Sequence, residues 1–478
     1  MNIAFLVSYL RTVQFHAVAT RLERQGHRVS WISPSRHWRR WLQGQGVPAE
    51  RIYDLTAHAS AWKDPAAPRV DLAELAPLEG PISLRDLVLM DRLLRRRPPH
   101  EAVSYLATHA RALAPFLRAQ GVEAVFGEQT HAFDLVTARV CEQLGVPLFA
   151  PHTVRIPSLR FGFFRGFTQA ELAPSRAPTD ADRDAAQRLL AEFRDRPPRP
   201  FYFAANARVP RPRLDWLPKV SKHLRLAWED RDDQTRPSLA ILGRTRLAES
   251  ARAALTAWTR PFAVAPLPAK RPFVLLTLHK QPEASIDVLG PRTSNQLELA
   301  RHVARALPAT HDLYVKEHSN AIGDRGPAFY GALAAIPGVV LVDPYQSSFE
   351  LMKHAALVLT VSGTIGFEAG LLGIPAATFA RMFFEPVLLR SGLSAEALTT
   401  PALTELLEEG RRWPATDHDE RAVAFLAGLL AQSFEGNVSG PQASADTMAP
   451  ANLDHIAHGF LTLLATLERS APGAEAAR

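Results

Sequence analysis

Two separate parts of the chain show the same alternation of short apolar runs with amphipathic helical segments. The apolar runs predict buried strands, at residues 3–7, 28–32, 123–126 and 148–150 in the first part and at 273–278, 312–315, 339–342, 357–361 and 376–379 in the second. Helical spacing predicts the segments between them, at residues 16–25, 104–120, 135–144 and 295–307. Strands separated by helices of this length form right-handed βαβ units and a parallel sheet. The sequence therefore predicts an α/β protein with two Rossmann-like domains.

The stretch between these two series has a different composition. Residues from about 184 to 237 are rich in Arg and Pro, which is typical of a surface excursion or a connection between domains. After residue 432 a polar stretch leads to a final amphipathic helix over 453–467. We therefore expect an N-terminal domain over 1–240 that includes the excursion, a C-terminal domain over 241–432, and a tail over 433–478 that packs back on the N-terminal domain.

The composition excludes several classes of protein. A chain of 478 residues with one cysteine, Cys141, is neither a disulfide scaffold nor the holder of a multi-cysteine zinc site. The formal net charge is +7, but the arginines are spread throughout and accompany no recognition motif, so we expect no nucleic acid as a partner. No apolar run is long enough for a signal sequence or a membrane span. We expect a cytoplasmic protein, in which the basic cluster at Arg92 and residues 95–97 is either a solvated helix end or a peripheral contact with anionic lipid of the inner membrane.

The second domain carries the clearest candidate site, because ligands of open parallel sheets bind outside the carboxyl ends of the strands. The strand at 357–361 leads directly into Ser362, Gly363 and Thr364 at the start of a helix. The unpaired amides and positive dipole end of such a helix, together with two hydroxyls and a glycine, predict a phosphate cradle. An ordinary helix N-cap is the alternative interpretation. Lys316 and His318 follow a nearby strand and can add positive charge and hydrogen-bond donors to the same anion.

Other polar residues also leave the strands of the second domain. Those that follow the strand at 273–278 are His279, Lys280, Gln281 and Glu283. Several polar residues directly after one buried strand suggest contacts with a nucleotide or a sugar. For Lys280 alone, a place in a solvated loop is the preferred interpretation. Glu368 lies one turn beyond Thr364, where it either accepts hydrogen bonds from ribose hydroxyls or pairs with surface cations.

In the first domain, Glu128 stands just beyond the strand at 123–126. A carboxylate there is placed to deprotonate an acceptor hydroxyl or to attack a sugar carbon, and a capping or surface glutamate is the alternative. His131 lies three residues later, and His152 and Arg155 follow the next strand, where they can hold an anionic group. The sequence thus predicts Glu128 and His318 as catalytic candidates. It predicts His131, His152 and Arg155 as acceptor-binding candidates. The chain has no P-loop, no dinucleotide fingerprint and no zinc-protease or serine-hydrolase motif.

Several segments occur in an order that resembles a known family. They are His279 to Ser285, Leu313 to His318, Ser347 to Leu351, Thr360 to Glu368 and Gly373 to Pro375. In this order they resemble the bacterial capsule polysaccharide biosynthesis family, which includes the β-Kdo transferases that start capsule linkers. The resemblance covers about Leu275 to Glu385, about a quarter of the chain. One departure is that the family usually has proline after the histidine, where this chain has Ser319, which puts the turn geometry and the donor in question.

The resemblance implies a GT-B glycosyltransferase, with two Rossmann-like domains facing each other across a cleft. It implies that the C-terminal domain binds a CMP-activated donor, such as CMP-Kdo or a related acidic sugar, through the segment at His318 and the Ser362–Thr364 loop. It also implies a glycan or glycolipid acceptor on the N-terminal domain, no cofactor and no metal. A CDP-alditol phosphotransferase of the same fold and a non-catalytic GT-B-like binding protein remain as alternatives, and the stereochemical outcome stays open.

Overall fold

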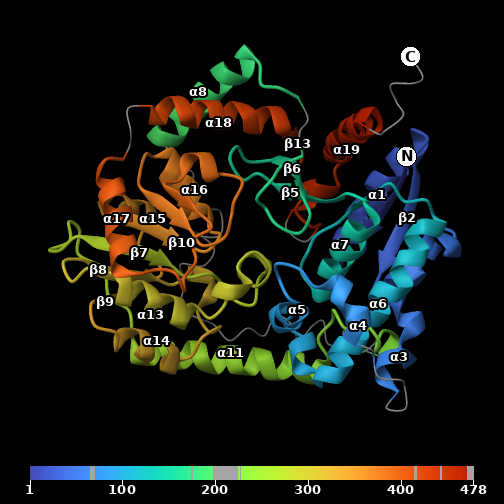
Figure 1. Ribbon diagram of the computed structural model, residues 1–478, viewed down its shortest axis with the longest axis horizontal. Helices are drawn as coiled ribbons and strands as arrows, with labels where there is room; N and C mark the ends of the chain where they lie inside the picture. The colour runs from blue at the N-terminus through green and yellow to red at the C-terminus, as the bar shows by residue number, and fades with distance from the viewer. Residues whose placement is uncertain are drawn as a thin grey trace. The chain divides into compact units, whose positions relative to one another are not determined.

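The computed structural model of the chain divides into two compact units (Figure 1). Unit 1 comprises residues 1–177, 220–239 and 429–478, and unit 2 comprises residues 178–219 and 240–428. The structure describes all residues except 65–69, 71, 174–175, 197–223, 225, 227, 414–416, 442–443 and 471–478.

Unit 1 is built on a twisted sheet with the strand order β13-β6-β5-β4-β1-β2-β3. Its strands are β1 (Asn2–Leu6), β2 (Arg28–Ser33), β3 (Ile52–Asp54), β4 (Ala124–Phe126), β5 (Leu148–Thr153), β6 (Arg160–Arg165) and β13 (Phe434–Glu435). Its helices are α1 (Arg11–Arg24), α2 (Arg36–Gly44), α3 (Ser60–Lys63), α4 (Leu72–Leu75), α5 (Leu84–Met90), α6 (Pro99–Ala119), α7 (Ala132–Leu144) and α19 (Pro450–Ser470). The central strands β1 and β4 are apolar on both faces because helices cover the sheet on both sides.

A cluster of phenylalanines forms the centre of unit 1. Phe460 of α19 packs on Phe126 of β4 and on Phe163 of β6, with ring centroids 4.9 and 4.8 Å apart. Phe5 of β1 lies 5.5 Å from the same ring. Helix α19 also lies beside α1, as Figure 1 shows. The last helix of the chain therefore supplies part of the core of unit 1.

Unit 2 has a parallel sheet with the strand order β12-β11-β10-β7-β8-β9. Its strands are β7 (Phe273–Thr277), β8 (Asp312–Lys316), β9 (Val339–Val342), β10 (Leu357–Thr360), β11 (Ala376–Thr378) and β12 (Arg390–Ser391). Its helices include α8 (Asp180–Asp195), α12 (Ala284–Asp287), α13 (Gln296–Ala306), α14 (Pro327–Ala334), α15 (Ser348–His354), α16 (Thr364–Leu371) and α17 (Thr400–Arg411). Two further helices, α11 (Leu239–Thr259) and α18 (His418–Gln432), extend across the unit boundaries. Strands β10, β7 and β8 are adjacent, so their carboxyl ends meet at one edge.

The prediction of two Rossmann-like units is confirmed, but two details of it are wrong. The sheet of unit 1 is not wholly parallel, because β6 returns from β5 as an antiparallel strand and β13 then pairs antiparallel with β6. The stretch over 184–237 is not solely a surface excursion, since α8 buries Ala186, Leu190 and Phe193. Most of its Arg/Pro-rich centre lies outside the described residues.

Within the described part of the chain, no helix is both long and apolar enough to cross a membrane.

Candidate functional site

The carboxyl edge of the unit 2 sheet brings His279 and Ser362 together. His279 stands two residues beyond β7, and Ser362 stands two residues beyond the adjacent strand β10. The backbone amide of Ser362 donates to His279 Nε2 at 3.2 Å. Because Nε2 accepts this bond, the neutral ring carries its proton on Nδ1. Gln296 of α13 fixes the backbone of His279 by two further hydrogen bonds, of 2.7 and 3.1 Å.

The turn into α16 is closely packed around Gly363. A Cβ atom at Gly363 would lie 2.6 Å from Thr360 Oγ1 and 3.5 Å from His279 Cε1, so only glycine fits there without a shift of its neighbours. Gly363 is the N-cap of α16 and contributes no side-chain cap. The first amides of a helix have no intrahelical acceptor, and they meet the positive end of the helix dipole. The backbone amides of Gly363 and Thr364 stand at this helix start, and the phosphate cradle that the sequence suggested there stays a prediction.

Ser362 itself has a different role from the one its hydroxyl suggested. Its side chain is fully buried, and its Oγ donates to the backbone carbonyl of Ser285 in α12. That bond joins the turn after β10 to the segment after β7. The structure thus engages both the amide and the hydroxyl of Ser362 within the protein, and its predicted contact with a donor stays a prediction.

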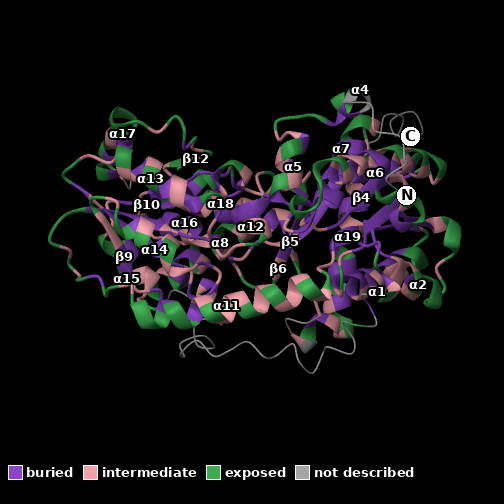
Figure 2. Cartoon of the chain, turned by 90° about the horizontal axis from the view of Figure 1, so that it is seen from below, coloured by how far each residue is buried: buried purple, intermediate pink, exposed green. Residues whose placement is uncertain are grey.

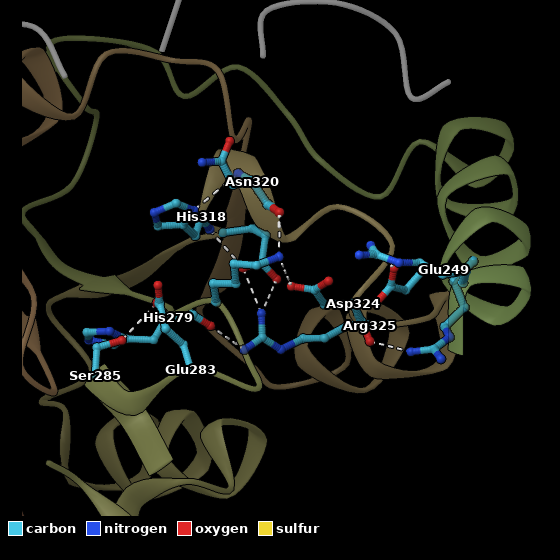
Figure 3. A network of polar contacts seen from close by, with 12 residues as sticks. Glu249, His279, Glu283, Ser285, His318, Asn320, Asp324 and Arg325 are labelled. Atoms are coloured by element: carbon cyan, nitrogen blue, oxygen red, sulfur yellow. Dashed lines mark hydrogen bonds and ion pairs between the residues drawn. The ribbon is translucent and has the colours of Figure 1, made fainter. Parts of the chain in front are cut away.

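A buried ion pair between Glu317 and Arg325 lies next to this edge. Both carboxylate oxygens of Glu317 lie 2.7 Å from Arg325 Nη1, and the Tyr330 hydroxyl donates to Oε2 at 3.0 Å. Arg325 Nη2 donates to the carbonyl of His279 at 2.6 Å, as Figure 3 shows. The side chains of Glu317 and Arg325 are 1% and 9% exposed. This network fixes the end of β8 to the segment that carries His279.

Lys316 and His318 flank that glutamate at the end of β8. Lys316 is 5% exposed, and its Nζ donates to the carbonyl of Pro344 at 2.7 Å. Burial lowers the pKa of Lys316 to about 8, against the raising effect of Asp343. Its amino group therefore joins β8 to the loop after β9, and its contact with a donor stays a prediction.

His318 is half-buried, and its ring is held in one tautomer. Its Nδ1 accepts the amide of Asn320 at 3.1 Å, so the neutral ring carries its proton on Nε2. Burial lowers the pKa of His318, which keeps the ring neutral at pH 7, although Glu283 and Glu317 act in the opposite direction. The side chain can thus offer an N–H donor without a full charge.

The other donor-side candidates occupy the same edge. Gln281 Nε2 donates to Asp287 at 3.0 Å, and Gln281 accepts from Gln296. Glu283 is exposed and accepts from the hydroxyl of Ser285 at 2.9 Å (Figure 3). Glu368 is half-buried on the second turn of α16. These positions leave all three roles as predictions.

Lys280, which we expected to be solvated, is instead part of this packing. Its Nζ pairs with Asp324 at 3.0 Å and donates to the carbonyl of Asn320 at 3.1 Å. It thereby holds the loop that follows β8.

In unit 1, Glu128 lies at the carboxyl edge between β4 and β1. Its carboxylate forms an ion pair with Arg11 at the start of α1 and accepts from the Ser8 hydroxyl at 3.3 Å. The preceding Gly127 allows this approach, because a Cβ there would lie 2.4 Å from Leu6 Cβ. The side chain of Glu128 is 29% exposed, so it is accessible from solvent although it pairs with Arg11.

A small pocket opens at the same edge of unit 1. It is lined by Val7, Ser8, Tyr9, Pro34, Ser35, Trp38, Thr130, His131, Asp134, Asp233 and Thr235. His131 Nδ1 lies 3.4 Å from Asp91 Oδ2, and His131 Nε2 lies 3.2 Å from the Tyr9 hydroxyl. That hydroxyl in turn donates to the carbonyl of Thr235. The predicted acceptor residue His131 is therefore part of a hydrogen-bonded chain at a pocket wall.

Carboxylates around this histidine have shifted pKa values. Burial alone would lower the pKa of His131, but Asp91 and Asp134 outweigh it and raise the value. For Asp91 the two effects have the opposite signs. Burial alone would raise its pKa, but the contact with His131 outweighs burial and lowers the pKa to about 2. Burial raises the pKa of Asp134 to about 6, and burial with the nearby Asp230 raises that of Asp233 to about 7. The carboxylate oxygens at this wall favour ligands that donate hydrogen bonds, as sugar hydroxyls do.

His152 and Arg155 are not among the lining residues of that pocket. His152 lies on β5, and its Nδ1 lies 3.0 Å from the carbonyl of Thr153. Burial, with the charge of Arg155, lowers the pKa of His152 to about 3, so the ring is neutral at pH 7. A neutral ring is a poor anchor for an anion, and acceptor binding by these two residues stays a prediction.

Sequence reasoning missed the residues that connect distant segments. Arg325 and Tyr330 were not singled out, because nothing in the pattern shows that the loop after β8 turns back to Glu317. Asp91 and Asp233 were missed because they lie in segments without a strand. The acidic run at 229–233 was the available signal, since four acidic residues interrupt an otherwise Arg/Pro-rich stretch.

Among the residues that the structure describes, no group of three or more His, Cys, Asp or Glu side chains is arranged to hold a metal ion.

Comparison with known proteins gives the following findings. No protein-family model matches the chain, and no curated protein matches it. Among solved structures, it is similar to the KpsC β-Kdo 2,7 transferase of Thermosulfurimonas dismutans, at 11% identity over 74% of this chain and 89% of that one, with a TM-score of 0.33. It is also similar to the UDP-GlcNAc 2-epimerase of Methanocaldococcus jannaschii, at 14% identity over 90% and 99% of the two chains, with a TM-score of 0.27. A third similar structure is MurG of Acinetobacter baumannii, at 12% identity over 96% and 98%, also with a TM-score of 0.27.

The first of these structures is a β-Kdo transferase, the class that the segment Leu275 to Glu385 resembles in sequence.

Proposed function

We propose that the protein is a glycosyltransferase whose unit 2 binds a nucleotide-activated sugar at the carboxyl edge of β10, β7 and β8. The observation that carries the proposal is that three adjacent strand ends deliver His279, the start of α16 and His318 to one edge. Backbone amides at a helix start bind phosphate without any cationic side chain. A CMP-activated sugar, with Kdo as the first candidate, is the donor that the sequence resemblance favours.

The chemistry that we assign to this edge is stabilisation of the leaving nucleotide. Negative charge develops on the phosphate as the bond to the sugar breaks, and preorganised donors act most strongly on such developing charge. The amides of Gly363 and Thr364 and the Nε2–H group of His318 are donors of this kind. His318 is the residue that we assign to catalysis here, and His279 positions the Ser362 turn.

For the acceptor, we propose the pocket of unit 1. Its hydrogen-bonded chain of Tyr9, His131 and Asp91 suits hydroxyl groups of a glycan or glycolipid. Glu128 is the carboxylate that we assign to the reacting centre, because it is accessible from solvent and the contacts with Arg11 and Ser8 orient it.

Turnover of a defined donor tests the proposal. The full chain is incubated with CMP-Kdo and a bacterial glycolipid extract, and CMP release and product formation are followed. We expect CMP release by the wild-type chain and its loss in His318→Ala, whereas His302→Ala, a surface histidine of α13, leaves it unchanged. Turnover of CDP-glycerol in place of CMP-Kdo identifies an alditol phosphotransferase instead. Absence of turnover with both donors, or an unaltered rate in His318→Ala, contradicts the assignment.

A further inference from the structure

Helix α11 exposes several of its largest apolar residues, the reverse of an ordinary surface helix. Leu247, Leu255 and Trp258 are 68%, 48% and 81% exposed. With the exposed Ala251 and Ala254, they fall within an arc of about 100° when successive residues are placed 100° apart. Figure 2 shows exposed and intermediate residues along this helix. The result is a continuous apolar stripe on the outer face of α11.

The opposite face of α11 is fixed to the loop that follows β8. Ala253 is buried there, and a Cβ atom at Gly323, whose φ is +97°, would lie 2.6 Å from the carbonyl oxygen of Glu249. Arg252 of α11 donates to the carbonyl of Asp324 in the same loop. This packing against the loop backbone fixes which face of α11 points inward. The apolar stripe lies on the opposite face and therefore points away from the loop.

The charges along the stripe are of one sign. Arg244 lies in the same arc at its first turn, and Arg260 follows the last residue of the helix; both are exposed. The only acidic residue of α11 is Glu249, which lies on the inner face and pairs with Arg246 at 3.1 Å. Leucine and tryptophan flanked by arginine is the pattern of helices that lie in the interface of an anionic bilayer.

A second copy of the chain fits this surface less well. Pairing of two parallel copies of α11 would place Arg244 beside its own equivalent, and antiparallel pairing would place it beside Arg260. Either arrangement brings like charges together, with no acidic side chain in the arc to separate them. Anionic lipid headgroups neutralise both arginines, whereas the apolar side chains enter the acyl boundary.

We propose that the outer face of α11, from Arg244 to Arg260, is a membrane-docking surface that binds anionic lipid bilayers. Docking would not require the glycosyltransferase assignment, because it rests on exposure and charge alone. It would hold the loop with Asp324 and Arg325, and with it the candidate donor site, at a fixed height above the lipid surface.

Vesicle co-sedimentation of the full chain tests the proposal. The vesicles are phosphatidylcholine with phosphatidylglycerol, compared with phosphatidylcholine alone. We expect binding to the anionic vesicles that is weakened at least about a hundredfold in the triple variant Leu247→Gln, Leu255→Gln, Trp258→Gln. The pair Arg244→Gln, Arg260→Gln should lose on the order of tenfold and most of the salt dependence.

The control replaces equally exposed apolar residues elsewhere. Leu89 and Trp228 are 63% and 83% exposed, and the variant Leu89→Gln, Trp228→Gln should bind vesicles as the wild type does. All variants change exposed side chains, so their melting temperatures should match that of the wild type. No binding of the wild type to anionic vesicles, or equal binding of the triple variant, overturns the proposal. A dimer of the wild type that the triple variant abolishes, without vesicle binding, assigns the stripe to a second copy instead.

Discussion

Removal of Arg325 should destabilise unit 2 far more than its small contact area suggests. The side chain of Glu317 is 1% exposed, and Arg325 Nη1 lies 2.7 Å from both of its oxygens. Arg325→Met leaves that carboxylate buried with the Tyr330 hydroxyl and the backbone but no countercharge. Loss of one partner of a buried ion pair costs about 3–5 kcal/mol. Arg325→Lys, which keeps the charge but loses the planar fork, should cost less.

The second variant, Glu317→Gln with Arg325→Met, separates charge from packing. Glutamine still accepts from Tyr330, and no uncompensated charge remains, so the double variant should recover most of the loss to within about 1–2 kcal/mol of the wild type. Hydrogen exchange of peptides from β7 and β8 reports the stability of unit 2 separately from that of unit 1. A double variant as unstable as Arg325→Met, or an Arg325→Met loss below about 1 kcal/mol, would refute the reasoning that the pair is a buried charge requiring its partner.

Three further predictions concern single groups. Gly363→Ala forces a Cβ to within 2.6 Å of Thr360 Oγ1 and should cost about 1–3 kcal/mol in urea unfolding, whereas Gly331→Ala, with open space around it, should gain up to about 1 kcal/mol; equal effects would contradict the packing argument. Burial lowers the pKa of Lys316 to about 8, so between that pH and its unfolded value of 10.5 the unfolded state binds more protons and stability rises with pH. Lys316→Met should remove this rise, which is at most about 1.4 kcal/mol per pH unit, and an unchanged slope would argue against it. Burial raises the pKa of Asp233 from 3.8 to about 7, so stability falls as pH rises across that range, and Asp233→Asn should unfold at higher urea than the wild type at pH 8 but not at pH 4.

Most of the strands, and the edges of the sheets, could be predicted from the sequence because these strands are short and mainly apolar runs. Phe273 to Leu278 and Leu357 to Val361 are of this kind, and the polar residues that follow them necessarily lie at the carboxyl edge of a parallel sheet. For the same reason the sequence led to His279 and Gly363, whose proximity the structure confirms.

What could not be predicted depends on contacts between segments far apart in the chain. The antiparallel strand β13 pairs Phe434 with Phe161, more than two hundred residues away, and its two residues carry no recognisable strand pattern. The roles of Lys316 and Ser362 depend on carbonyl groups of Pro344 and Ser285, and no side-chain pattern reports the position of a carbonyl. The residue types indicated which functional groups lie at the edge of the sheet. Only the fold shows which of those groups form hydrogen bonds within the protein.

We propose that the start of α16 binds the phosphate of a cytidine nucleotide. Isothermal titration of CMP into the full chain tests this, with Gly363→Ala and Gly331→Ala as the variant and its control. We expect binding of CMP to the wild type and to Gly331→Ala, and affinity lower by at least about tenfold in Gly363→Ala, where the new Cβ displaces the turn. No binding of CMP to the wild type, or equal affinity in all three proteins, would contradict it.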